Sequence, residues 1–185
     1  MSHARLASMS SSITDIGIIV SQKRFGEADK FVKILTQNHG LIDTVAKGVR
    51  RLTSKKSSHL DDLNLIKFQT NRGKEPQYLS QVETIDNFKL IKADLKKIRT
   101  CFYLMEILNG VLVINQPDEI LFIKLKDFLV SLDQADGSYR NLATDFQEFL
   151  IGHLGFNRPK NNHPQSLVDY FESLIDRHLV SRQIK

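Results

Sequence analysis

A run of basic residues between Val45 and Ser58 is the part of this 185-residue sequence whose residue types most directly indicate a binding chemistry. The stretch VAKGVRRLTSKKSS contains no acidic residue, and its cations are Lys47, Arg50, Arg51, Lys55 and Lys56. Several cations on one surface bind a phosphate backbone, because each one displaces counterions that are condensed on the polyanion. We therefore expect this stretch to be an exposed loop that contacts phosphate groups.

Other residues in the same half of the chain extend this predicted surface. Ser54 carries a small hydroxyl that can donate a hydrogen bond to phosphate. Arg24 follows a predicted strand, and Arg72 and Lys74 lie in a predicted turn. The predicted nucleic-acid-binding set is Lys47, Arg50, Arg51, Ser54, Lys55, Lys56, Arg24, Arg72 and Lys74. The alternative is a solvated loop whose charges only maintain solubility.

The distribution of charge supports a polyanionic ligand. The formal net charge is +5, and residues 1–80 contain 13 Lys and Arg against 7 Asp and Glu. Residues 81–185 contain 13 basic against 14 acidic residues, so the excess positive charge lies entirely in the first part. A basic module joined to a neutral one is typical of proteins that bind nucleic acid.

Patterns typical of catalysis are absent from the sequence. It has no P-loop, no dinucleotide-binding glycine motif and no H-E-x-x-H. Cys101 is the single cysteine, which excludes an intrachain disulfide and a multi-cysteine zinc site, and its apolar helical spacing predicts a buried thiol. His39 lies in a predicted turn, where we expect a hydrogen-bonding or surface role. We therefore expect no catalytic residue, no metal and no cofactor, and a protein that is not an enzyme.

The chain also lacks the segments that direct a protein to or through a membrane. It has no apolar run of about 18 residues. Its first residues contain no apolar core of a signal peptide. We expect a cytoplasmic protein with no membrane partner.

Hydrophobic alternation and β-branched residues predict five short strands over residues 13–22, 28–37, 41–49, 63–71 and 77–85. The segment SSHLDD at 57–62 is suited to a short helix or turn between the third and fourth strands. This order favours a five-stranded OB-fold barrel, a fold that binds oligonucleotides. Phe31 and Phe68 are expected in its core, which leaves Phe25 as the better candidate for base stacking.

After Asp86 the hydrophobic period becomes helical. Four helices are expected, over residues 88–113, 117–132, 139–155 and 166–180, with Pro117 in a first turn and Ser166 as an N-cap. The predicted fold class is α+β, an OB-fold barrel followed by an all-α domain. The predicted organisation is a flexible leader at 1–12, a nucleic-acid-binding domain at 13–86 and a helical domain at 87–185.

Several motifs occur in a characteristic order and spacing. They are GEAD followed by Lys30, then HG at 39–40, AKG at 46–48, Arg50 with Arg51, and Ser54 with Lys55. This order resembles the N-terminal region of the bacterial recombination mediator RecO. The segment LIDRHLVSR near the end is similar to that family's terminal helix in Arg177, Leu179, Ser181 and Arg182.

The resemblance implies an OB-fold barrel, binding of single- and double-stranded DNA, annealing of complementary strands and no enzymatic turnover. It also implies a set of partners: RecR, the acidic C-terminal tail of the single-strand-binding protein (SSB) and, through these, RecA. The family usually carries a long insertion before the last helix, often with four cysteines around zinc. Here ten residues separate Gly155 from Ser166, so we expect a compact, zinc-free form. Lys124, Lys126 and Arg140 are candidates for receiving an acidic tail.

Two other classes of binding protein remain open from the residues alone. One is an adaptor whose basic loop meets an acidic peptide. The other is an RNA-binding protein, because the same barrel also serves RNA.

Overall fold

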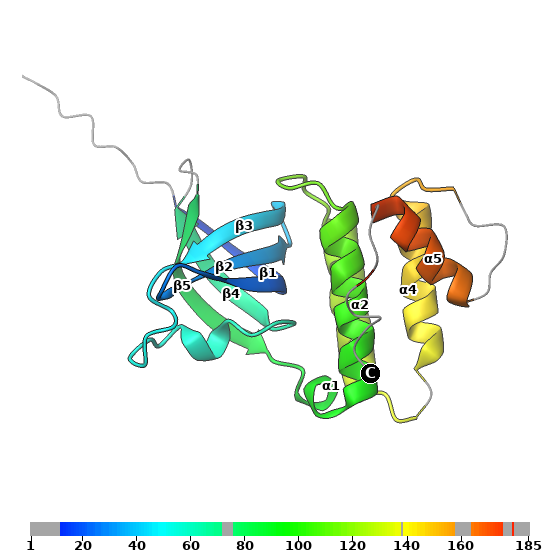
Figure 1. The fold of residues 1–185 in the computed structure, drawn as a ribbon, viewed down its shortest axis with the longest axis horizontal. Coiled ribbons are helices and arrows are strands. Elements are labelled where there is room, and N and C mark those ends of the chain that lie inside the picture. Colours follow the sequence, from blue (N-terminus) through cyan, green and yellow to red (C-terminus); the bar gives the residue numbers. More distant parts are fainter. Residues whose placement is uncertain (1–11, 72–75, 138, 158–163, 176–178, 180–185) are drawn as a thin grey trace, which may run out of the picture.

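The computed structural model describes residues 12–71, 76–137, 139–157, 164–175 and 179. Its strands are β1 (Ser12–Phe25), β2 (Asp29–Thr36), β3 (Gly40–Ala46), β4 (Leu65–Asn71) and β5 (Gln77–Asp86), with a short 3-10 helix, η1 (Ser57–His59), before β4. Its helices are α1 (Lys89–Ala93), α2 (Leu95–Val111), α3 (Glu119–Gln134), α4 (Arg140–His153) and α5 (Pro164–Ile175). The strands and the helices form two separate groups, side by side (Figure 1).

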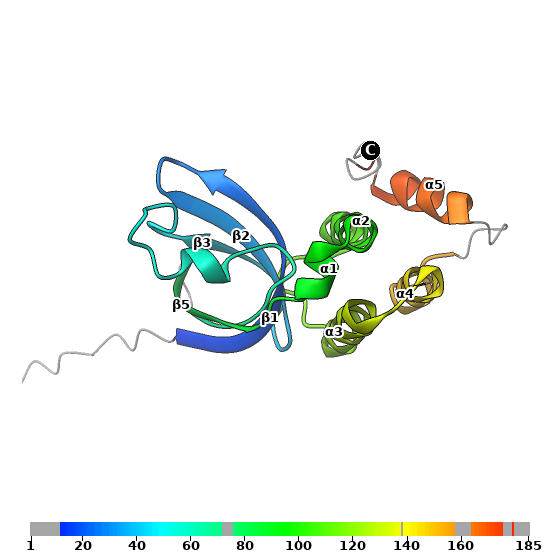
Figure 2. The ribbon, with the colours of Figure 1, turned by 90° about the horizontal axis from the view of Figure 1, so that it is seen from below.

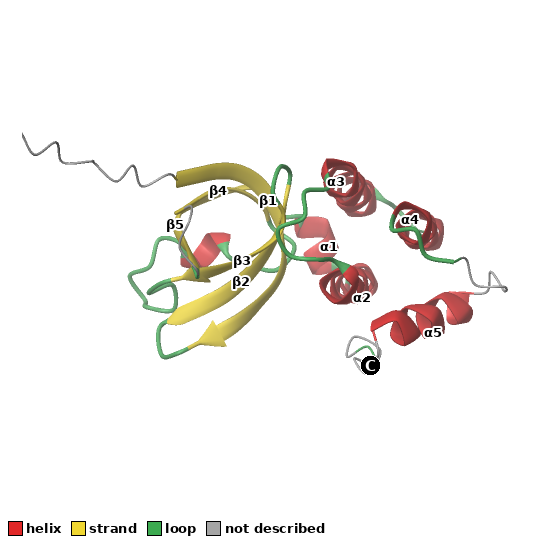
Figure 3. Cartoon of the chain, turned by 90° about the horizontal axis from the view of Figure 1, so that it is seen from above, coloured by secondary structure: helices red, strands yellow, loops and turns green. Residues whose placement is uncertain are grey.

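The strands close into a barrel in the order β1-β2-β3-β5-β4, with β4 pairing back to β1. Among the pairs of described barrel strands, the short contact between β3 and β5 is parallel and the other four are antiparallel. This closed barrel, with η1 inserted between β3 and β4, confirms the predicted OB-fold and the predicted α+β class. Figure 3 shows the barrel in yellow beside the red helices, with α1, α2 and α3 next to it and α4 and α5 farther away.

Two hydrophobic clusters hold the fold together. One fills the barrel and includes Val32, Ile34 and Phe68. The other joins the outside of the barrel, at Leu35 and Leu41, to the buried faces of the helices. This second cluster contains residues of both the strands and the helices. The boundary between a barrel domain at 13–86 and a helical domain at 87–185 therefore stays a prediction from the sequence.

The prediction that Phe31 lies in the core is wrong, whereas Phe68 is buried as predicted. Phe31 is partly exposed and belongs to neither cluster. Its neighbour Val32 points into the barrel. Successive residues of a strand point to opposite faces, so Phe31 lies on the outside.

The predicted single helix over residues 88–113 is also wrong, because the chain breaks at Asp94 into α1 and α2. The Asp94 carboxylate accepts hydrogen bonds from the backbone N–H groups of Lys96 and Lys97, which caps α2. These hydrogen bonds lower the pKa of Asp94. The described part of the chain therefore contains five α-helices where four were expected.

Two predicted helix starts are shifted. Asp118 is the N-cap of α3, so Pro117 precedes the helix instead of occupying its first turn. Helix α5 begins at Pro164, which places Ser166 inside it and not at its N-cap. By contrast, Gly155 follows the end of α4 with φ of 74°, the left-handed conformation that favours glycine at a helix end.

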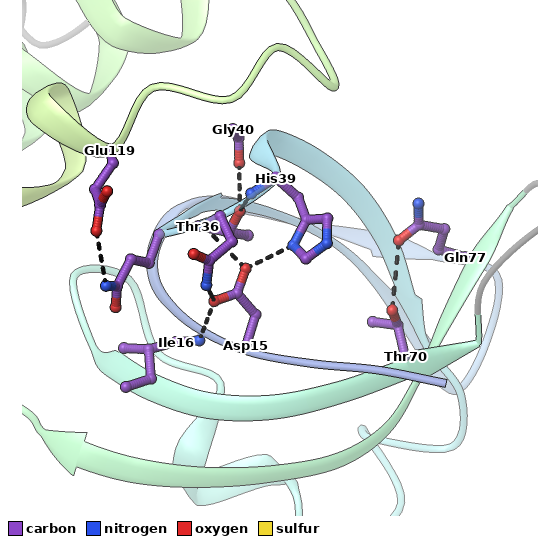
Figure 4. Close-up of polar contacts among 10 residues, drawn as sticks. Asp15, Ile16, Thr36, His39, Gly40, Thr70, Gln77 and Glu119 are labelled. Carbon is purple, nitrogen blue, oxygen red and sulfur yellow. Dashed lines mark hydrogen bonds and ion pairs between the residues drawn. The ribbon is translucent and has the colours of Figure 1, made fainter. Parts of the chain in front are cut away.

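The β2–β3 turn is the point where the barrel meets the helices. Asp15 of β1 lies beneath this turn and accepts hydrogen bonds from the backbone and side chain of Asn38, while Nδ1 of His39 lies 2.7 Å from its carboxylate (Figure 4). The backbone N–H of Asn115, in the α2–α3 loop, donates to the carbonyl of Leu41. Asp15 thus fixes the β2–β3 turn to β1, and the Asn115–Leu41 hydrogen bond joins the beginning of β3 to the α2–α3 loop.

Gly40 completes this junction and yields a test of it. Its φ is +71°, and a Cβ added there would lie 1.9 Å from the carbonyl oxygen of Gln116. Gly26 has φ of +59° with nothing within 4 Å of an added Cβ. We expect Gly26→Ala to lower the free energy of unfolding by about 1 kcal/mol and Gly40→Ala by roughly 2–4 kcal/mol, measured by urea unfolding. Equal losses would contradict the close approach at Gly40.

Cys101 is buried as predicted, and burial raises the pKa of its thiol to about 12. At pH 8 almost none of the thiol is ionised, and only the thiolate reacts rapidly with disulfide reagents. We expect a thiol-reactive dye to label the protein only at the rate of unfolding, and rapidly in denaturant. Rapid labelling of the native protein would contradict this placement.

Candidate nucleic-acid interface

The predicted basic stretch forms the connection between β3 and η1, here named the basic loop and defined as residues 47–56. It lies at the end of the barrel remote from the helices, beside the β1–β2 turn (Figures 1 and 2). The barrel therefore uses one end for its junction with the helices and presents its basic residues at the other. Lys47, Arg50, Arg51 and Lys55 are exposed, whereas Ser54 and Lys56 are partly buried.

Arg50 fastens the basic loop to the β1–β2 turn. Its guanidinium donates hydrogen bonds to the carbonyl oxygens of Gly26, at 3.3 Å, and Glu27, at 2.9 Å. Its backbone N–H donates to the carbonyl oxygen of Ala28 at 2.9 Å. One arginine therefore satisfies three consecutive carbonyls of the turn and leaves its guanidinium exposed at the barrel end.

Asp29 fixes the start of the same loop. Its Oδ1 accepts a hydrogen bond from the backbone N–H of Gly48 at 2.7 Å, and Gly48 has φ of 65°. This contact is charge-assisted, a kind of hydrogen bond about twice as strong as a neutral one. The GEAD, AKG and Arg-Arg motifs, which are separate in the sequence, therefore form one hydrogen-bonded unit.

Two lysines of the loop contact β5. Nζ of Lys47 lies 4.2 Å from the centre of the Tyr78 ring, within the range of a cation–π contact. Nζ of Lys56 donates a hydrogen bond to the carbonyl oxygen of Leu79 at 3.2 Å. These contacts hold both ends of the loop against the barrel wall.

The side chains of Arg51 and Lys55 make no hydrogen bond or ion pair with any residue that the structure describes, and both are exposed. The ion pairs found among those residues are Lys33–Asp43, His39–Asp15 and His153–Asp118, so none uses a cation of the basic loop. The charge of Arg51 and Lys55 is thus available to an external anion.

The remaining predicted residues differ in where they lie. Arg24 is exposed near the end of β1, one residue from the β1–β2 turn that Arg50 contacts. The backbone N–H of Ser54 donates to the carbonyl of Arg51 and so closes a turn within the loop. Arg72 and Lys74 lie outside the described residues. The structure therefore brings Arg24 to the same end of the barrel as the basic loop.

Sequence reasoning missed the two anchors of this site. Asp29 was seen only as part of a motif, and Arg50 only as a free cation. The pairing of β2 with β3 connects these two residues. It places Lys30 opposite Ala46 and so brings the turn that contains GEAD next to AKG.

The other polar cluster, around Asp15 and His39, has a structural role. Among the described residues, the hydrogen bonds of the Asp15 side chain go to its own strand and to the β2–β3 turn (Figure 4). His39 has the hydrogen-bonding role expected from its position. Within the described ranges, no three His, Cys, Asp or Glu residues gather as metal ligands, and no helix is long and apolar enough to cross a membrane.

Comparisons with known proteins relate this sequence to DNA repair proteins. Residues 9–88 match the family model described as Recombination protein O N terminal. The chain is 29% identical over 140 residues to the DNA repair protein RecO of Acetivibrio thermocellus and 30% identical over 139 residues to that of Pelotomaculum thermopropionicum. These matches cover 76% and 75% of this chain, and 56% and 54% of the relatives. The chain thus spans about half the length of these curated relatives.

The barrel and its basic loop therefore lie within a segment that matches the RecO N-terminal domain, and the chain is similar to RecO repair proteins over about three quarters of its length. The resemblance expected from the spaced motifs is confirmed. The same motifs supply the hydrogen-bonded unit formed by Asp29, Gly48 and Arg50.

The anchoring role of Asp29 gives a further test. Asp29→Ala removes the acceptor of the Gly48 N–H, whereas Glu27→Ala removes an exposed carboxylate that makes no described side-chain contact. Both variants lose one negative charge. We expect trypsin to cleave the native Asp29→Ala protein several times faster at Arg50, Arg51, Lys55 and Lys56, because the loop opens locally more often. Glu27→Ala is expected to match the unmodified protein, and equal rates in the two variants would contradict the anchor.

Proposed function

We propose that this protein is a DNA-binding recombination mediator of DNA repair, which grips single- and double-stranded DNA through phosphate contacts. The observation that carries the proposal is a set of exposed cations that have no acidic partner among the described residues and are fastened at one end of an OB-fold barrel by Arg50. The basic loop and Arg24 form the grip. Arg72 and Lys74 are included among the proposed DNA-binding residues because of their position in the sequence.

The grip supplies affinity without reading sequence. Lys and Arg neutralise phosphates equally well along any DNA, and they release counterions as they do so. Two complementary strands held near one cationic surface repel each other less, so their encounters lead to pairing more often. Annealing proceeds downhill in free energy, and the proposed activity therefore needs no nucleotide cofactor, no metal and no catalytic residue.

The proposed partners come from the family. The relatives are named DNA repair proteins, and the resemblance implies RecR, the acidic tail of SSB and RecA as the proteins with which this chain acts. Lys124 and Arg140, exposed on α3 and α4, are candidates for contacting an acidic tail, together with the partly buried Lys126. We place the protein in the cytoplasm, at the nucleoid.

The contacts of the basic loop show which mutations remove charge without disturbing the loop. Arg50 and Lys56 hydrogen-bond to backbone carbonyls, so replacing them disturbs the loop itself. The side chains of Arg51 and Lys55 have no hydrogen-bond or ion-pair partner among the described residues, which makes Arg51→Ala/Lys55→Ala the cleaner variant. Lys89→Ala/Lys96→Ala removes the same charge from exposed positions on α1 and α2 and serves as the matched control.

We expect Arg51→Ala/Lys55→Ala to bind every single-stranded DNA sequence more weakly, with the salt slope reduced by roughly 0.7 per removed cation. Fluorescence anisotropy over a salt series measures both quantities. The control variant is expected to keep most of the affinity and the slope. Unchanged affinity in the loop variant, or an equal loss in both variants, would contradict the grip.

A further inference from the structure

A row of side chains crosses the outer face of the barrel beside the basic loop. The strand register pairs Lys23 of β1 with Phe31 of β2, Phe31 with Val45 of β3, and Val45 with Tyr78 of β5. Directly paired residues of adjacent strands point to the same face of a sheet, with Cβ atoms about 5 Å apart. The two aromatic rings therefore lie on one face, on either side of Val45.

This face is the outside of the barrel. Val32 and Ile34 belong to the barrel core, and the intervening positions of β2 point the other way. Phe31 and Tyr78 are partly exposed, but Val45 between them is only 1% exposed. Side chains on either side of Val45 thus cover it and still present part of their own surface to solvent.

A third ring extends the face toward the basic loop. Phe25 is paired with Asp29, two residues along β1 from Lys23 and on the same side of the strand. It is 52% exposed, so much of its ring is accessible to a ligand. Since Asp29 also holds Gly48, the exposed ring lies beside the anchored start of the loop.

Cations border these rings. Lys23 is exposed at one end of the row, and Lys47 lies over the Tyr78 ring at the other. Aromatic rings bordered by cations are the arrangement by which single-strand binders hold bases and phosphates together. A duplex cannot use the rings in this way, because its bases are already stacked and paired.

We propose that Phe25 and Phe31 form a base-stacking platform for single-stranded nucleic acid, and that Tyr78 positions Lys47 to contact the phosphates of the stacked strand. This inference rests on the proposed DNA grip and adds a selective element to it. The basic loop binds both single and double strands, whereas the platform acts only on unpaired bases. The outer face of the barrel therefore sets the preference between the two.

The chain contains no tryptophan, which provides a direct probe of stacking. Phe25→Trp and Phe31→Trp each introduce a single indole at the proposed platform, and Ile85→Trp places one at an exposed position outside it. We expect a single-stranded oligonucleotide to quench the first two indoles at saturation, and a duplex or an abasic oligonucleotide of equal length to quench neither. Absence of quenching by a bound single strand would overturn the platform.

Affinity provides the second test. Phe25→Ala/Phe31→Leu removes both rings and keeps an apolar side chain over Val45, so that the fold is retained. Its affinity for single strands is expected to fall roughly ten-fold or more, with duplex affinity changed less than about two-fold. Ile85→Ala, which also removes an exposed apolar side chain, is expected to change neither.

The outcomes separate the two proposals. If Phe25→Ala/Phe31→Leu loses equal affinity for single and double strands, or loses none, the platform is overturned. The proposal of a phosphate grip still holds in that case, provided that the unmodified protein binds DNA. Failure of the unmodified protein to bind either form at low salt would overturn the grip and the platform with it.

Discussion

The contact of Arg50 with the β1–β2 turn is the interaction on which the functional end of this barrel depends. Together with the Asp29–Gly48 hydrogen bond, it converts a long connection between β3 and η1 into a fixed part of the barrel surface. A loop held in this way loses little conformational entropy when it binds, so more of the charge attraction remains as affinity. The same contacts place Phe25 beside the loop.

The opposite end of the barrel is committed to the helices. Asp15 fixes the β2–β3 turn, and Gly40 allows the turn to approach the α2–α3 loop more closely than any side chain would permit. One hydrophobic cluster then continues from Leu35 and Leu41 into the helices. Because the junction and the basic loop occupy opposite ends, the proposed DNA contact at the loop would leave the helical surfaces open to a protein partner.

Local patterns in the sequence were sufficient to predict the barrel, the short helix η1 and the loop that carries the cations. This is because alternation, turn residues and charge are local properties. They were insufficient for Phe31, since the phase of an apolar strand is ambiguous when both faces are partly covered. The break at Asp94 was hidden by continuous helical spacing on both sides of it. The anchoring roles of Asp29 and Arg50 depend on strand pairing, which only the folded chain displays.

The proposed binding rests on phosphate contacts made by the basic-loop cations, which have no acidic partner among the described residues. The salt dependence of single-stranded DNA affinity for the unmodified protein tests it most directly. Neutralisation of three or more phosphates predicts a line of log affinity against log salt with a slope of about −2 or steeper, nearly the same for every base sequence. A flat line, or a slope that depends strongly on sequence, would contradict the account.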